Sequence, residues 1–548
     1  MSELQGEMAA DGAALAAAGG DAGAAAASSS AGHAFLVASG ILLSRIAGLV
    51  RQRVFAHYFG QSDAGDAFNA AFRIPNFLQN LFGEGVLSAS FIPVYSKLLA
   101  RGDEVEARRV AGVVATLLAL VTSVLVLAGM LATPVLVDVI APGFSGPKRE
   151  LTVRMVRIIF PGTGLLVLSA WCLGILNSHR RFFLSYTAPV LWSVAMIFAM
   201  LMFGGFVRTQ DLAVLLAWAS VGGAALQFLV QIPVVRRLAR GVRPSLDLRS
   251  AAARTVVRTF GPVFVGRGVV QISGYVDSVL ASFLPVGSVT ALANAQTLYL
   301  LPVSLFGMAV SAAELPAMSS LVGGRAEVAK ALCGRLDAGL SRVAFFIVPS
   351  AMAFLAVGDV IAAALFQTGR FSAEDATWVW GILAGSAVGL VATTLGRLYA
   401  SAFYALHDTR TPLRFATLRV LLTIGLGWFA SLHLPSMIGI DAKWGVAMLT
   451  ASAGVAGWVE FVLLRRTLHR RIGRTGIAPL HLATLWGGAL VGALLALVAR
   501  HLAPLDSHPV IRAAVVLLPY GAGYLGVTAA AGIGEARSLF ARILSRAR

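Results

Sequence analysis

The sequence has few cysteines and no ordered arrangement of histidines. Its only two cysteines, Cys172 and Cys333, both fall in or near apolar segments of the 548-residue chain. Neither a disulfide framework nor a cysteine-ligated metal site is therefore indicated. The nine histidines show neither H-x3-H nor HExxH spacing, so we assign no metal and no other cofactor.

Charged residues are scarce as well. They make up 13% of the chain, 57% of the residues are hydrophobic and the mean hydropathy is +0.80. A soluble domain typically carries about 25% charged residues, so this chain has too few to cover a water-facing surface. Apolar stretches long enough to cross the roughly 30 Å hydrocarbon core recur along it. Because a backbone in lipid must satisfy its own hydrogen bonds, the sequence predicts an all-α polytopic membrane protein.

The hydropathy pattern predicts about fourteen transmembrane helices. Residues 1–32 are rich in Ala, Gly and Ser and lack a basic n-region, which is typical of a disordered tail rather than a signal peptide. The spans are expected at about 34–57, 67–96, 110–140, 152–176, 184–206, 211–235, 256–283, 289–321, 338–366, 376–404, 413–433, 442–464, 479–500 and 510–531.

The positive charge is concentrated in alternate loops. A net charge of +18 would suggest nucleic acid for a soluble protein, but arginines in short loops set membrane topology, so no nucleic acid is expected. This alternation supports an even number of spans and places both termini in the cytoplasm. No loop is long enough to hold a folded catalytic domain. The basic segments are 97–109, 180–181, 236–249, 325–335, 410–414, 465–474 and 537–548.

An internal repeat divides the chain. The segment Ser88–Leu98 recurs as Ser311–Leu321, at an offset of 223 residues that spans six predicted helices. Such an offset preserves orientation and predicts parallel repeats about an axis along the membrane normal. We therefore expect an N-terminal six-helix lobe over 33–250, a C-terminal six-helix lobe over 251–475, and two extra helices with a basic tail over 476–548.

Ionisable residues cluster inside the first two predicted spans. Each costs about 2.5–3.5 kcal/mol on insertion scales, so these residues are functional candidates. At 100° per residue, Asp66, Arg73 and Glu84 share a face of the second span, approximately so because Pro75 should kink this helix. A buried ion-pair ladder would explain some of them, but the surplus of cations favours an anionic substrate, and the arginine fork suits a diphosphate. The candidates are Ser44, Arg45, Arg51, Asp66, Arg73, Asn76 and Glu84, with Arg267 and Asp277 in the seventh span.

Several of these residues belong to motifs, among them Ser44–Arg51, Phe72–Asn76 and Phe403–Pro412, and these motifs resemble the MurJ (MviN) lipid II flippases of the multidrug/oligosaccharidyl-lipid/polysaccharide exporter superfamily. The resemblance implies a fourteen-helix fold with two six-helix lobes around a cationic cavity. It further implies transport of undecaprenyl-diphosphate-linked peptidoglycan precursor across the bacterial cytoplasmic membrane by alternating access, with Arg45, Arg51, Asp66, Arg73 and Glu84 in or beside the cavity. The matching segments are Ser44–Arg51, Asp66–Phe68, Phe72–Asn76, Phe82–Gly85, Ser88–Ser96, Ala141–Phe144, Leu365–Phe371 and Phe403–Pro412.

The chain departs from this family pattern at two cavity positions. Gln79 and Thr297 stand where the family usually has cavity arginines, and the loss of two charge-assisted contacts should weaken diphosphate binding. Arg267 could restore one charge, so Arg267→Ala should abolish activity. Asp277 could contribute to a coupling-ion site, but Thr423 and Gly427 stand where its partners would be, which disfavours sodium coupling.

Four functions remain open at this point. The favoured one is a lipid-diphosphate flippase; the others are a related carrier for another polyprenyl-linked glycan or amphiphile, a membrane enzyme acting on the same lipid, and a divergent homologue without activity. The short loops and scattered histidines disfavour the enzyme. The sequence leaves open the cargo, the coupling ion, the oligomeric state, the conformation and any protein partner.

Overall fold

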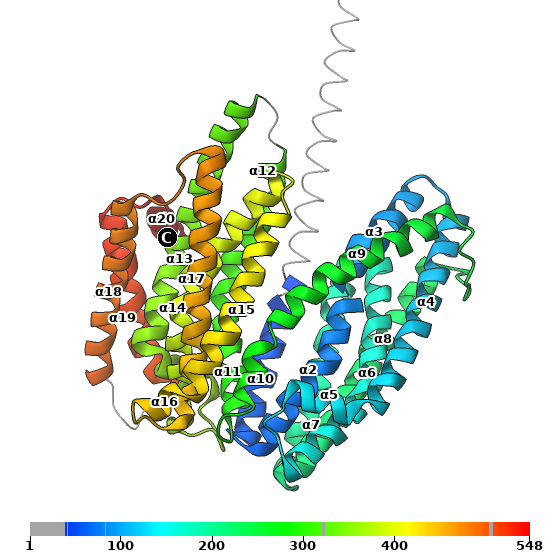
Figure 1. The fold of residues 1–548 in the computed structure, drawn as a ribbon, viewed down its shortest axis with the longest axis horizontal. Coiled ribbons are helices and arrows are strands. Elements are labelled where there is room, and N and C mark those ends of the chain that lie inside the picture. The colour runs from blue at the N-terminus through cyan, green and yellow to red at the C-terminus, as the bar shows by residue number, and fades with distance from the viewer. Residues whose placement is uncertain (1–38, 41, 83, 321–323, 503–507, 548) are drawn as a thin grey trace, which may run out of the picture.

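The computed structural model describes residues 39–40, 42–82, 84–320, 324–502 and 508–547 (Figure 1). Every regular element in these ranges is a helix, and the pair Thr368–Phe371 forms the one isolated β-bridge that the described residues contain. The all-α fold predicted from the sequence is thus confirmed.

The N-terminal lobe is built from helices that pack around α6. A first helix covers residues 42–59. The contacts of α6 with α2, α3, α4 and α8 make it the central element of the lobe. The remaining helices are α2 (Asp63–Phe82), α3 (Glu84–Ala100), α4 (Glu104–Leu131), α5 (Thr133–Ile140), α6 (Gly146–Ser178), α7 (Phe182–Phe203), α8 (Thr209–Leu238) and α9 (Ala251–Ser273).

The C-terminal lobe packs around α14, and the last helices lie on its outer side. The helix α14 contacts α11, α12, α13 and α17, while α18 and α19 pack against each other and against α13. The elements are α10 (Val276–Ala281), α11 (Ser288–Pro302), the π-helix η1 (Val303–Met308), α12 (Ala309–Ser319), α13 (Arg325–Phe366), α14 (Ala373–Ala405), α15 (Arg410–Leu432), α16 (Leu434–Met437), η2 (Ala442–Trp444), α17 (Gly445–Ile472), α18 (Pro479–Leu502), α19 (Pro509–Ala530) and α20 (Gly534–Ala547).

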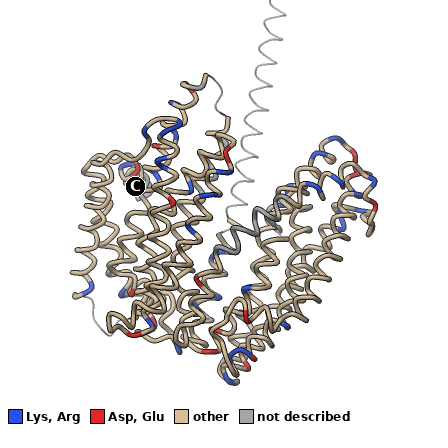
Figure 2. The backbone as a smooth tube through the Cα atoms, viewed as in Figure 1, with Lys and Arg blue, Asp and Glu red and all other residues tan. Residues whose placement is uncertain are grey.

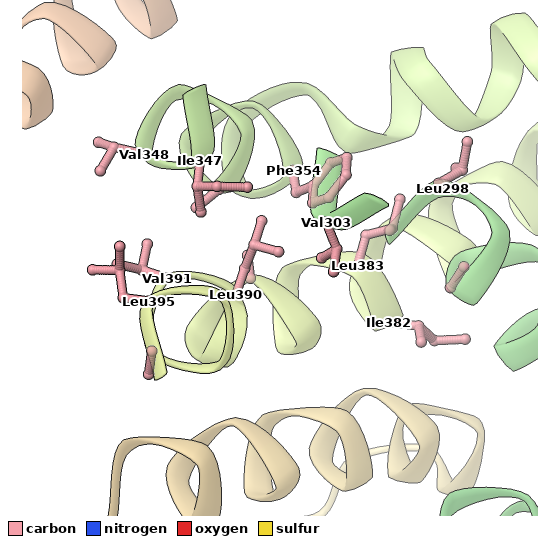
Figure 3. Packing of buried hydrophobic residues seen from close by; sticks show 14 of the residues in the cluster. Leu298, Val303, Ile347, Val348, Phe354, Ile382, Leu383, Leu390, Val391 and Leu395 are labelled. Carbon is pink, nitrogen blue, oxygen red and sulfur yellow. The ribbon is translucent and has the colours of Figure 1, made fainter. Parts of the chain in front are cut away.

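Aliphatic and aromatic side chains fill the core of the C-terminal lobe. Ile347 and Val348 of α13 and Leu390 of α14 are fully buried where these two helices face each other (Figure 3). Leu298 of α11 and Val303 of η1 join the same cluster. This continuous apolar core makes the C-terminal lobe a rigid support for the helices that face the other lobe.

Eleven helices of the described residues are long and apolar enough to cross a membrane. The protein is therefore a multi-pass membrane protein, while the predicted number of fourteen spans stays a prediction. The helix α2 is not among the eleven, because polar side chains such as Asp66, Asn69 and Arg73 lower its mean hydropathy. The sequence also predicted one helix over 67–96; α2 ends at Phe82 and α3 begins at Glu84, and residue 83 between them lies outside the described residues. The expected alignment of Glu84 with Asp66 and Arg73 stays a prediction, because the Glu84 side chain also lies outside the described ones.

The two lobes form a V. They meet at one end, near α5, α10, α11 and α16, and diverge at the other, near α3, α9 and α12 (Figure 1). We call these the closed end and the open end. The loops 101–103, 179–181 and 239–250 lie at the open end, and Figure 2 shows Lys and Arg gathered there. These three predicted basic loops thus share one end of the molecule.

The helix α9 packs in the N-terminal lobe, although the sequence boundary at 251 assigned it to the second lobe. It contacts α2, α3 and α4, and its Phe260 and Phe264 pack against Phe82 with ring centroids 5.9 and 5.0 Å away. The next helix, α10, contacts mainly α11, α15 and α17, and α5 to a smaller extent. The chain therefore passes from one lobe to the other at residues 274–275.

Candidate functional site

A cavity of about 230 Å³ lies between the two lobes. The N-terminal lobe contributes most of its wall, and the C-terminal side contributes Tyr275, which precedes α10, and Gln296 of α11. Two of the lining residues are arginines, and none is acidic. The lining residues are Arg51, Gln52, Phe55, Phe68, Asn69, Phe72, Arg73, Asn76, Trp192, Met196, Tyr275 and Gln296.

The spacing of residues along α2 explains why one face of this helix lines the cavity. Phe68, Phe72 and Asn76 are four residues apart and therefore lie in a row on one side of the helix, with Arg73 beside them. The opposite side carries Ala67 and other small or apolar residues, which pack into the apolar core of the N-terminal lobe. Burial of that second side fixes the rotation of α2 and directs the polar side toward the C-terminal lobe.

Arg51 reaches the cavity from the first helix and lies on an aromatic ring. Its Cζ atom is 4.4 Å from the centroid of the Trp192 ring, and its Nη1 atom is 4.0 Å from Sδ of Met196. No carboxylate among the side chains that the structure describes forms an ion pair with it. The cavity therefore holds a guanidinium whose charge is not neutralised by these groups.

Arg73 is the second cavity arginine, and Tyr275 positions it. The Arg73 Cζ atom is 5.8 Å from the Tyr275 ring centroid, and the Tyr275 hydroxyl donates to the Arg73 carbonyl oxygen over 3.2 Å. Asp277 lies near enough to interact electrostatically with Arg73 but forms no ion pair with it. The Oδ1 atom of Asp277 is buried and has no hydrogen-bond partner among the described residues.

Side-chain amides complete the wall. Gln52 Nε2 donates to Asn294 Oδ1 of α11 over 2.7 Å, and Asn69 Nδ2 donates to Thr290 Oγ1 over 3.3 Å. Both hydrogen bonds connect the lobes. Asn76 and Gln296 also line the cavity. The site therefore combines two cations, neutral hydrogen-bonding groups and aromatic faces.

Asp66 lies outside the cavity lining and connects the lobes at the closed end. Its Oδ1 atom accepts hydrogen bonds from the Thr290 amide and hydroxyl over 2.8 and 2.9 Å, and its Oδ2 atom accepts from the Gly287 amide over 2.8 Å. Lys148 of α6 lies 2.7 Å from Oδ2 and 3.0 Å from Asp63. Asp66 thus caps the N-terminus of α11 instead of pairing with Arg73, because these donors occupy both its oxygens.

A second set of contacts at the closed end involves the first helix. Arg53 Nη1 donates to the carbonyl oxygens of Ala364 and Leu365 over 2.7 and 2.9 Å, at the C-terminus of α13. His57 Nδ1 lies 2.8 Å from Thr368 Oγ1. These contacts hold the N-terminal lobe against the loop that joins α13 to α14.

The other predicted site residues lie elsewhere. Ser44 and Arg45 are on the first helix toward the open end, Ser44 partly buried and Arg45 exposed, and neither lines the cavity. Arg267 belongs to α9 and Glu84 begins α3, but both side chains lie outside the described ones. Thr297 donates its hydroxyl to the Ala293 carbonyl of its own helix, and the preceding residue, Gln296, faces the cavity in its place.

The sequence reading did not identify the aromatic part of the site. Phe55, Phe68, Phe72 and Trp192 form consecutive ring contacts, with Phe72 and Trp192 centroids 5.3 Å apart. Aromatic residues are common in apolar spans, so their presence alone gave no signal. The period of four in Phe68, Phe72 and Asn76 was the one available clue, since it places these residues beside Arg73.

Two helical lobes that enclose an arginine-lined cavity and diverge at one end define the class of two-lobed membrane carriers. The family model described as lipid II flippase MurJ matches residues 55–508. The lipid II flippase MurJ of Burkholderia cenocepacia is 33% identical over 447 residues, which cover 80% of this chain and 84% of the relative. This chain therefore belongs to the lipid II flippase MurJ family, as the motifs predicted.

Solved structures agree on the fold. The structure of lipid II flippase MurJ in an inward closed conformation matches with a TM-score of 0.73 and 22% identity, covering 90% of this chain and 99% of that chain. An inward-facing multidrug resistance MATE family transporter matches with a TM-score of 0.60 and 17% identity, covering 77% and 95%. The fold is thus shared with both of these solved structures.

Proposed function

We propose that this protein is a flippase that moves lipid II, the undecaprenyl-diphosphate-linked peptidoglycan precursor, from the inner to the outer leaflet of a bacterial cytoplasmic membrane. It acts as a carrier and not as an enzyme. The observation that carries the proposal is the pair Arg51 and Arg73. Both face an inter-lobe cavity without an ion-pair partner among the described side chains. A diphosphate supplies the negative charge that this pair of cations lacks.

The chemistry of the cavity fits the headgroup of such a lipid. Each guanidinium offers paired N–H donors in a planar fork that matches phosphate oxygens. The neutral amides of Asn76 and Gln296 can exchange hydrogen bonds with sugar hydroxyl and amide groups, and the rings of Phe68 and Phe72 offer apolar faces. The absence of acidic groups from the cavity lining disfavours a cationic drug as cargo.

The orientation of the V supports loading from the cytoplasm. Positively charged loops lie at the open end, and short basic loops face the cytoplasm. In this orientation both termini are cytoplasmic, and the conformation is open toward the side on which the precursor is made. Transport then requires the contacts of Asp66, Arg53 and His57 at the closed end to break as the open end closes.

The remaining sequence candidates have secondary roles in this proposal. Ser44 and Arg45 lie on the first helix between the open end and Arg51, where they would meet the headgroup on entry. Arg267 and Glu84 are retained as substrate-contacting residues on sequence grounds. Asp277, with an unpaired buried oxygen near Arg73, is the acidic residue that we assign to ion coupling.

The test is rescue of a bacterium depleted of its own flippase, with appearance of lipid II in the outer leaflet as the readout. The unaltered chain should restore growth and translocation. Arg51→Gln and Arg73→Gln should each reduce translocation at least tenfold, because a charge-assisted contact worth about 1.5–3 kcal/mol is lost. Arg208→Gln is the matched control, since Arg208 is an exposed loop residue. A well-expressed unaltered chain that moves no lipid II would contradict the proposal.

A further inference from the structure

The guanidinium of Arg51 lies against the indole of Trp192, a residue of α7 to which nothing above assigns a role. The distance of 4.4 Å from Cζ to the ring centroid places the cation over the ring in a cation–π contact. Met196, one helical turn further along α7, contributes a sulfur atom 4.0 Å from Nη1. The helix α7 therefore supplies the surface on which Arg51 lies.

Trp192 is itself held firmly. Its Nε1–H donates to the Ser220 carbonyl oxygen of α8 over 3.1 Å, and its ring contacts Phe72 at a centroid distance of 5.3 Å. On the third side lies Gly223, where an added Cβ would come within 3.0 Å of the Trp192 Cα atom. These three contacts from α2 and α8 prevent the indole from rotating away.

Contact through the ring face leaves the edge of the guanidinium accessible to a ligand. A guanidinium stacked on an aromatic ring keeps its N–H donors, which point outward in the guanidinium plane, free for a ligand. A carboxylate partner would use those donors and cancel the charge. Trp192 thus orients Arg51 and leaves its charge, and the donors that are not directed at Met196 Sδ, available.

We infer that Trp192 is the positioning residue that presents the N–H edge of Arg51 to the diphosphate of the substrate. The inference rests on the proposed function and deepens it, because it identifies how the anion-binding group is oriented. Trp192 acts through Arg51 and does not itself bond the phosphate. Its removal should therefore weaken diphosphate binding only while Arg51 is present.

The experiment is a double-mutant cycle on the purified full-length chain in lipid nanodiscs, with farnesyl diphosphate as the titrated ligand. Trp192→Leu should weaken binding about tenfold, and Trp192→Phe, which keeps an aromatic face, by less than threefold. In an Arg51→Gln background, Trp192→Leu should cause less than a twofold further loss. Trp218→Leu is the matched control, because Trp218 is an exposed tryptophan of α8 outside the cavity lining.

The affinities of the variants distinguish a positioning role of Trp192 from a packing role. If Trp192→Leu lowers the affinity for farnesyl diphosphate equally with and without Arg51, Trp192 has only a packing role in the lobe. Equal losses of affinity in Trp192→Leu and Trp192→Phe would lead to the same conclusion. Thermal unfolding of every variant checks folding, and Trp192→Met replaces Trp192→Leu should the latter not fold. If the unaltered chain binds no farnesyl diphosphate and moves no lipid II, the proposed function is contradicted. If it binds farnesyl diphosphate with an affinity that the Trp192 substitutions do not change, only the present inference is contradicted.

Discussion

Arg51 and Arg73 show how a cation is kept inside a membrane protein without an ion pair to any described carboxylate. Each lies near an aromatic ring, Trp192 or Tyr275, and each borders a cavity that admits polar groups. A cation–π contact contributes about 0.5–2 kcal/mol, which is less than the cost of fully burying a charge. The arginines are therefore arranged to gain most of their stabilisation from an anion that enters the cavity.

Among the groups outside the spans, His179 gives a testable pH dependence. It caps the end of α6 at the open end, with Nε2 3.2 Å from the Tyr95 hydroxyl. Partial burial, reinforced by Arg181, lowers the pKa of His179 below its ordinary value, against the opposing effect of Glu104. The unfolded chain therefore takes up the proton first as the pH falls, and this contribution to stability is lost from about pH 6.5 downward.

The expected result is a lower melting temperature at pH 5.5 than at pH 7.5 for the unaltered protein. The difference should be smaller in His179→Gln, because glutamine can still accept the Tyr95 hydrogen bond but does not titrate. Thermal unfolding in detergent at both pH values measures it, with His501→Gln, an exposed residue at the end of α18, as the control. The same pH difference in all three proteins would rule out His179 as its source.

The two cavity arginines were predictable as candidates because charged residues inside apolar spans are conspicuous. Trp192 and Tyr275 were not, since a single aromatic residue in a span looks like any lipid-facing or core residue. Asp66 was found as a candidate, but its partners come from α6 and α11, and sequence spacing within α2 cannot reveal groups 82 and 221 residues away.

At the scale of elements, the capping of α11 by Asp66 joins the lobes at a helix terminus. A helix N-terminus carries unsatisfied N–H groups and a partial positive charge, so a carboxylate there is stabilising. Asp66 is 1% exposed, whereas Asp63, the other partner of Lys148, is half exposed. Both carboxylates pair with Lys148, but they should contribute different amounts to the free energy of unfolding.

Asp66→Ala should therefore lower thermal stability strongly, by about 3–5 kcal/mol, because Lys148 and the amides of α11 lose a buried partner. Asp63→Ala should cost no more than about 1 kcal/mol, as for exposed ion pairs. Denaturant or thermal unfolding of both variants provides the comparison, and translocation activity should follow the same order. Similar losses in the two variants would show that α11 is not held by this cap.

The contact between α14 and α17 depends on glycines. Gly385 and Gly389 are one turn apart on α14, and an added Cβ would collide with the backbone of Ala447 and Gly454 of α17, respectively. Small residues at such positions let two membrane helices approach closely. This crossing supports the C-terminal lobe, whose α11 carries Gln296 and the groups bonded to Asp66.

Gly389→Ala is expected to destabilise the protein by about 1–3 kcal/mol, the usual cost of overpacking. Gly396→Ala on the same helix is the matched control, because a Cβ there would meet no atom within 4 Å. Melting temperatures of the two variants in detergent give the measurement. A Gly389→Ala protein as stable as Gly396→Ala would mean that α14 and α17 can separate without cost.

At the scale of the whole molecule, the closed end is held by polar contacts between lobes that must separate during transport. Cysteines at His57 and Thr368, in a background with Cys172 and Cys333 replaced by alanine, allow the lobes to be joined by a short thiol crosslinker. Crosslinking should abolish translocation, and reduction should restore it, because the closed end can then open again. Transport assayed before and after reduction checks this.

The control pair lies within one lobe. Lys443 and Glu374 form an ion pair of 2.9 Å inside the C-terminal lobe, so a crosslink between cysteines at these positions should leave transport intact. Loss of activity in this pair too would point to damage by the reagent, and continued transport in the crosslinked His57–Thr368 pair would contradict alternating access at this end.

The sequence predicted the helical membrane fold and the family, because hydropathy, loop charge and motifs are local signals. It did not predict the aromatic part of the cavity, because a ring in an apolar span looks like any core residue. Nor did it predict that α9 packs with the first lobe. That packing depends on contacts of Phe260 and Phe264 with Phe82, far away in the chain, and such contacts leave no periodic pattern.

The position of α9 leaves a short segment, residues 274–275, as the connection between the lobes. Because α9 belongs to one lobe and α10 to the other, relative rotation of the lobes must bend the chain at Gly274 and Tyr275. Tyr275 is also the residue that lies over Arg73. Tyr275 thus both lines the cavity and lies at the connection between the lobes, so a rotation of the lobes about this connection changes the position of its ring relative to Arg73.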